Sequence, residues 1–412
     1  MTARPLPAHR RRRAAAAASA FAALALTTVA APPAVAAEGV DLPPVPTAVA
    51  PDKPCTAESP TVVTAVPWAQ QALDLGHVGQ LHQGAGVTVA VVGTGVSTTA
   101  PALSGRVTAL GDGGSDCVGH GTFLAGLVAA RPVPGQGFSG IAPQARILAA
   151  RGTGPRGETD GGRLAAAITQ AADAGAGVIA VGAFVTTDDP ALRAAVSHAL
   201  EKDAVVVATA APENNATGPR DAPVRVYPAA QPGVIAVVGT GPGGARPQNA
   251  PRPERADLSA PGDVMVGIGP RGAGHWTASG SAEAAAVVAG AAALVRGYHP
   301  ALTGPEVRAR LLATAYPGEQ PALDVYAAVS ASRPAVSGSA PATGAGAGQS
   351  AAAPRTLEVP EGPTGHGAGR TAVLVAGAAG AVLLTALLLM AVVPRGRARR
   401  WRPGGSAGPS AP

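Results

Sequence analysis

Short apolar runs alternate with helix-like stretches between residues 87 and 238, and this alternation strongly limits the possible fold. Continuous β-branched runs separated by helices predict a parallel sheet that is covered on both faces. Only 3% of the residues are aromatic, so the core must consist of valine, alanine and leucine. We therefore expect one α/β domain over residues 67–333, with no internal repeat. The expected strands lie within 87–92, 146–149, 178–181, 205–208 and 234–238, and the expected helices are 122–130, 162–174 and 190–202.

The formal charge of +6 belongs to the two ends of the chain rather than to a binding face. Residues 1–36 carry five arginines and no acid, residues 394–412 carry five more, and the part between has a net charge of about −4. This distribution gives no support to nucleic-acid binding. Arginines followed by a long alanine-rich stretch and Ala34-Val35-Ala36 are typical of a secretory signal peptide, here residues 1–36. An uncleaved N-terminal anchor is the alternative.

A second apolar stretch near the C-terminus predicts a membrane anchor. Residues 371–393 carry no charge, and as a helix at about 1.5 Å per residue they would be long enough to cross a bilayer. Five arginines follow, so the tail 394–412 is expected in the cytoplasm and the main domain on the other side of the cell membrane. A buried core helix is the less favoured alternative. Residues 334–370, rich in Ala, Gly, Pro, Ser and Thr, are expected to be a flexible linker.

The chain contains two cysteines, Cys55 and Cys117. In an exported protein, two cysteines most economically form one disulfide, whereas two free thiols are the alternative. A disulfide would attach the N-terminal extension, residues 37–66, to the main domain.

Residues 280–290 read Gly-Ser-Ala-Glu-Ala-Ala-Ala-Val-Val-Ala-Gly. They resemble the nucleophile segment of the subtilisin-like (S8) serine proteases over eleven positions without a gap. Ala282 stands where that family has the attacking serine. A methyl group cannot attack a carbonyl, so this resemblance implies the fold of a protease without its nucleophile.

The histidine of that family is present. Residues 116–122 read Asp-Cys-Val-Gly-His-Gly-Thr and resemble the start of the family's histidine-bearing helix, with His120 as the remnant triad histidine. The aspartate that would orient it is missing, because Gly93 stands at its position after the run 89–92. Asp112 and Asp116 lie close in sequence, but neither is an evident replacement.

Further departures surround the same intended site. Pro212 falls on the position of the oxyanion asparagine, although Asn214 or Asn215 could substitute for it. Glu283 adds a charge where an apolar residue is usual, and Phe184 brings a bulky ring to the substrate edge. Removing the serine of subtilisin costs roughly 10⁶ in turnover, so the missing nucleophile alone disfavours proteolysis.

The periphery of the domain narrows the resemblance to the mycosins, membrane-anchored subtilases associated with type VII secretion in actinobacteria. The matching segments, within residues 50–393, include both cysteines, 66–73, 227–229, 257–262, 289–296, 305–311 and 323–329. The resemblance implies a subtilisin-like three-layer fold, no cofactor or metal, and partners in a secretion membrane complex.

Three functions remain open at this point. The favoured one is a pseudoprotease with a structural or protein-binding role. The second is an active serine endopeptidase with a rebuilt nucleophile at Ser281 or Ser279. The third is a peptide-binding module that keeps the groove without its chemistry, and Phe184 argues against it.

Overall fold

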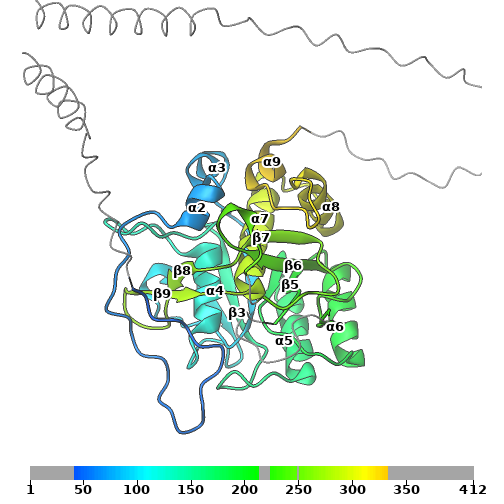
Figure 1. Ribbon diagram of the computed structural model, residues 1–412. Helices are drawn as coiled ribbons and strands as arrows, with labels where there is room; N and C mark the ends of the chain where they lie inside the picture. The colour runs from blue at the N-terminus through cyan, green and yellow to red at the C-terminus, as the bar shows by residue number, and fades with distance from the viewer. Residues whose placement is uncertain (1–40, 213–222, 248–249, 333–412) are drawn as a thin grey trace, which may run out of the picture. The chain divides into compact units, whose positions relative to one another are not determined.

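The computed structural model describes residues 41–212, 223–247 and 250–332. Within them, seven parallel strands form one sheet in the order β2-β3-β1-β4-β5-β6-β7. Figure 1 labels β3, β5, β6 and β7 among them. Strand β1 lies inside the sheet, between β3 and β4, and its residues 89–92 are buried because both faces of the sheet are covered. The strands are β1 (Thr88–Gly93), β2 (Val107–Leu110), β3 (Arg146–Arg151), β4 (Val178–Val181), β5 (Val205–Thr209), β6 (Ile235–Thr240) and β7 (Leu258–Pro261).

Helices cover both faces of this sheet. Side chains of a strand point alternately to opposite faces, so Val89 and Val91 join the core under one helix layer and Ala90 and Val92 join the other. The first layer contains α4 (His120–Ala129) and α7 (Ser281–Tyr298), and the second contains α5 (Gly161–Asp173) and α6 (Pro190–Glu201). Two apolar cores therefore sandwich the sheet.

Helix α7 is buried along most of its length. All its residues from 281 to 295 are buried, and eight of those fifteen are alanine. A helix that is apolar on all sides belongs inside a protein, and small side chains let it approach the sheet and α4 closely. The one carboxylate in this buried stretch, Glu283, is therefore conspicuous.

Smaller elements complete the domain. Strands β8 (Met265–Ile268) and β9 (His275–Ala278) form an antiparallel pair beside the main sheet. The helices not yet named are α2 (Trp68–Ala72), α3 (Leu75–Leu81), α8 (Gly304–Thr314) and α9 (Val325–Ser330), with short 3₁₀ turns at Pro101–Leu103 and Pro242–Gly244.

The predicted three-layer α/β architecture is confirmed, with helix and strand ends shifted by one or two residues. The edge strands β2 and β7 and the β8–β9 pair were not predicted as strands. The pattern of β2 is half-exposed, β7 is only four residues long and ends in proline, and glycine interrupts the apolar residues of β8.

The predicted signal peptide, linker, transmembrane helix and cytoplasmic tail all lie outside the described residues. Among the residues that are described, no helix has the length and apolar character needed to span a membrane.

Candidate active site

The candidate site lies where β1 and β4 end and α4 and α7 begin. Gly93 is the last residue of β1, His120 the first of α4, and Ala282 the second of α7. Ligands of parallel sheets bind at these carboxyl ends of the strands. Gly93, His120 and Ala282, which the sequence aligns with a catalytic triad, thus lie at the same edge of the sheet.

Asp116 shapes the start of α4 rather than serving the histidine. Its Oδ1 accepts hydrogen bonds from Gly119 N (2.7 Å) and Thr94 Oγ1 (2.9 Å), and its Oδ2 accepts from Thr122 N (2.8 Å) and Thr122 Oγ1 (2.7 Å). Four donors saturate the buried carboxylate and satisfy free N–H groups at the helix start. This agrees with the expectation that Asp116 is no replacement for the triad aspartate.

Asp112 is also engaged elsewhere. Its Oδ2 lies 2.9 Å from Arg151 Nε, while the Arg151 guanidinium donates to the carbonyl oxygens of Thr94 and Ser115. Asp112 therefore attaches the turn that follows β2 to strand β3 through its ion pair with Arg151. Both aspartates near His120 in the sequence are thus bonded to other groups.

Gly93, at the position aligned with the triad aspartate, borders open space. A Cβ built on Gly93 would meet no atom within 4 Å. Gly93 and His120 line a cavity of about 260 Å³, together with Thr153, Phe184 and Pro212. Because the backbone at Gly93 has a negative φ, glycine is not required there for conformational reasons. Neither a lack of space nor the backbone conformation explains why glycine stands at position 93.

Position 282 offers no reactive group, and the neighbouring serines bond elsewhere. The Ala282 side chain is fully buried. Ser281 Oγ accepts a hydrogen bond from Gly239 N at 3.3 Å, on β6, and Ser279 Oγ accepts from Val264 N at 2.8 Å. Both hydroxyls are therefore occupied by backbone donors of other segments.

A buried carboxylate faces the histidine from α7. Glu283 Oε1 lies 3.2 Å from His120 Nε2, and the two side chains are 1% and 6% exposed. A carboxylate only accepts hydrogen bonds, so Nε2 acts as the donor and cannot take a proton from a nucleophile. Within the described residues the second oxygen, Oε2, is buried and has no hydrogen-bond partner. The sequence marked Glu283 as a charge in an apolar segment but did not predict its contact with His120.

Pro212 stands at the position that the sequence aligns with the oxyanion asparagine. Pro212 follows β5 and lines the cavity, whereas Asn214 and Asn215 lie outside the described residues. The Phe184 ring, which was expected to intrude on the groove, lines the same cavity.

The N-terminal segment 41–66, called the arm below, runs across this region. Its residues Thr47 and Ala48 line the cavity beside His120, and Val49 N donates to Arg156 O at 2.9 Å. The Arg156 guanidinium in turn donates to the carbonyl oxygens of Ala50 (2.7 Å) and Lys53 (2.9 Å). The arm therefore forms one wall of the candidate site.

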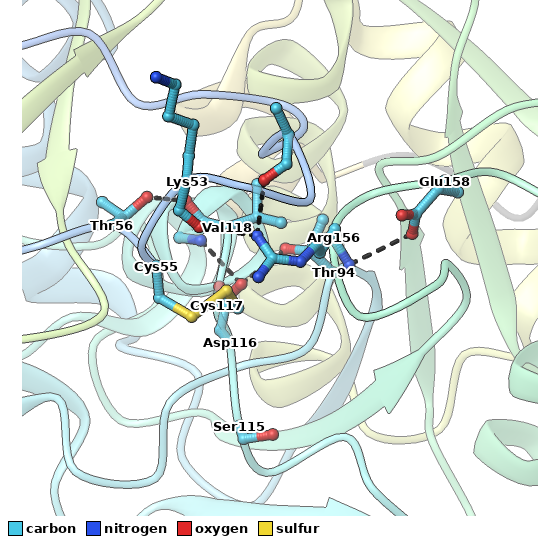
Figure 2. Close-up of a disulfide and its surroundings, with 12 residues drawn as sticks. Lys53, Cys55, Thr56, Thr94, Ser115, Asp116, Cys117, Val118, Arg156 and Glu158 are labelled. Atoms are coloured by element: carbon cyan, nitrogen blue, oxygen red, sulfur yellow. Dashed lines mark hydrogen bonds between the residues drawn. A yellow bond between two sulfur atoms is a disulfide. The ribbon is translucent and has the colours of Figure 1, made fainter.

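A disulfide attaches the arm just before α4. The predicted bond between Cys55 and Cys117 is present, and the next residue, Thr56, donates from N to Cys117 O (2.9 Å) and from Oγ1 to Val118 O (2.6 Å) (Figure 2). Since Cys117 lies three residues before His120, the bond fixes the arm beside the histidine.

The described residues contain no group of three or more His, Cys, Asp or Glu that could hold a metal ion.

Comparisons with known proteins agree with this geometry. Residues 84–352 match the subtilase family. Mycosin-4 of Mycobacterium tuberculosis is 33% identical over 403 residues, which cover 85% of each chain. A crystal structure of MycP1 from the ESX-1 type VII secretion system superimposes with a TM-score of 0.60 at 28% identity, over 72% of this chain and 97% of that one. A chain of an intact ESX-5 inner membrane complex does so with a TM-score of 0.58 at 26% identity, over 86% of this chain and all of the other.

Proposed function

The chain belongs to the subtilase family, in its mycosin branch, and we propose that it is a pseudoprotease with a structural or protein-binding role in a type VII secretion membrane complex. The main domain would lie outside the cytoplasm, held by a single C-terminal membrane span. One similar structure is part of an ESX-5 inner membrane complex, and this supports an assembly role apart from proteolysis.

The observation that carries the loss of proteolysis is the contact between Glu283 and His120. In place of a serine hydroxyl, the histidine meets a carboxylate, and its Nε2–H donates a hydrogen bond to Glu283 Oε1. Ala282 and Gly93 remove the nucleophile and the orienting carboxylate. Proton abstraction from a serine, the first step of this chemistry, therefore has neither its acid nor its base.

An activity assay tests the proposal. Purified full-length protein and its His120→Ala variant are incubated with casein and with fluorogenic peptides, beside an active subtilase. We expect both forms to match the buffer blank. Cleavage by the wild type that disappears in the variant would overturn the proposal.

Active-site labelling separates the alternative of a rebuilt nucleophile. A fluorophosphonate probe reacts with an activated serine, and we expect no label on Ser281 or Ser279 because backbone N–H groups occupy both hydroxyls. Label on either serine, mapped by mass spectrometry, would favour an enzyme.

The assembly role needs its own experiment. Deletion of the gene should destabilise the secretion membrane complex on native gels, and the wild-type gene should restore it. A serine-protease inhibitor should leave that restoration unchanged. An intact complex in the deletion strain would contradict the structural role.

A further inference from the structure

The arm crosses a channel whose floor is formed by glycines. A Cβ on Gly274 would overlap the carbonyl oxygen of Ser59, and a Cβ on Gly137 would overlap that of Ala65. Arm residues 59–65 therefore lie directly on bare backbone, where any side chain would exclude them. Ser59 and Val63 are buried in this channel.

Three hydrogen bonds to other segments hold this part of the arm. His275 N donates to Thr61 O at 2.7 Å, Gly137 N donates to Val63 O at 3.0 Å, and Val63 N donates to His275 Nδ1 at 3.0 Å. The third is the only one of these that depends on a titratable side chain. Its acceptor must be an unprotonated nitrogen, so His275 is neutral with its proton on Nε2.

The surroundings of His275 oppose its protonation. The residue is fully buried, its ring lies edge-on to Phe138, and its Nε2 has no hydrogen-bond partner among the described residues. This burial lowers the pKa of His275 below the usual 6.5.

Few charged groups lie on the segments around this ring. The arm carries Asp41, Asp52, Lys53 and Glu58, of which Glu58 is nearest in sequence to residues 59–65. The turn before β9 contributes Arg271, the segment that carries Phe138 begins at Arg131, and α4 contributes His120. The paired strand β8 has no charged residue. The pKa of His275 is lowered by burial, and no charged group contributes to this shift.

We propose that His275 is an acid-sensitive clasp, which holds arm residues 59–65 in their channel when neutral and releases them when protonated. A proton on Nδ1 would place a second donor against Val63 N–H, so the bond becomes a repulsion. The disulfide at Cys55 and the helix that begins at Trp68 keep both ends of the released segment attached. Release would uncover the channel and the backbone N–H of His275 at the start of β9.

The direction of the pH dependence follows from linkage. Released His275 titrates near 6.5, whereas clasped His275 has a lower pKa, so the released form binds more protons between the two values. The clasp is fully stable above about pH 6.5 and weakens as the pH falls, by up to about tenfold in its equilibrium constant per pH unit.

Hydrogen exchange measured by mass spectrometry on the full-length protein tests the clasp. Peptides that cover residues 56–66 are followed from pH 7.5 to pH 5, after correction for intrinsic exchange. We expect their protection factor to fall up to about tenfold per unit below pH 6.5, while peptides of β4 stay protected. Unchanged protection of the arm down to pH 5 would overturn the proposal.

Two variants and one further readout keep the result interpretable. His275→Asn keeps an acceptor near the Nδ1 position but does not titrate, so its arm should exchange independently of pH. His77→Gln, at an exposed histidine, should behave as the wild type. If His275→Asn loosens the arm at every pH, ¹⁵N-histidine NMR of the wild type decides, because protonation of His275 must coincide with release. A pH-dependent arm in His275→Asn would refute the role of this residue.

Discussion

The pair of His120 and Glu283 should now serve stability, and truncation of Glu283 measures this. The two side chains connect the first turns of α4 and α7 inside the core. Breaking a buried pair from one side costs about 3–5 kcal/mol, because the remaining polar group stays buried without its partner. Loss of a negative charge at the start of α7 adds about 0.3–1 kcal/mol. We therefore expect Glu283→Ala to lower the free energy of unfolding by at least about 3 kcal/mol.

Urea unfolding of the purified protein, followed by circular dichroism, gives this value. The combined variant His120→Leu with Glu283→Leu supplies the matched control, since replacing both partners by apolar residues is often neutral or stabilising. We expect the double variant to be more stable than Glu283→Ala. If Glu283→Ala changes the unfolding free energy by less than about 0.5 kcal/mol, the pair is not structural and the argument fails.

Three further predictions concern the site and the scaffold. Gly93→Asp combined with Ala282→Ser should leave the rate of peptide cleavage at trace level. Adding Pro212→Asn should raise that rate by about 10²–10³, which is the effect of one oxyanion donor. Efficient cleavage by the double variant would refute the need for this donor. Arg255→Ala should cost about 3 kcal/mol in urea unfolding, because this guanidinium donates to three backbone carbonyl oxygens and to a carboxylate, and a loss below 1 kcal/mol would contradict it. Cys55→Ser should cost about 4 kcal/mol for the loop of 62 residues, and an unchanged denaturation midpoint would show that the loop contributes nothing.

Much of the fold could be predicted from local pattern, whereas contacts across the fold could not. The run at 88–93 predicts a buried strand because β-branched residues follow one another without interruption. The position of Ala282 follows from its motif. The contact between Glu283 and His120 joins residues 163 positions apart, and nothing in either segment indicates that the carboxylate turns inward.

The arm shows the same limit. Residues 37–66 have no periodicity, so the sequence predicts only an extended segment attached by a cysteine. Its course depends on glycines at 137 and 274, where the missing side chain matters only because another chain segment lies above it. This fit between the arm and the bare glycine backbone can be recognised only in the folded structure.

The arm also completes the small β8–β9 sheet. Thr277 N donates to Pro43 O at 3.0 Å, and Val45 N donates to Thr277 O at 2.9 Å, so backbone groups on the outer side of β9 are satisfied by the chain's own N-terminal segment. An uncovered strand edge is a template for pairing with other molecules. A protein truncated to begin at residue 67 would expose that edge, and we expect it to self-associate. We therefore expect the arm to protect the domain against aggregation, independently of any chemistry at the candidate site.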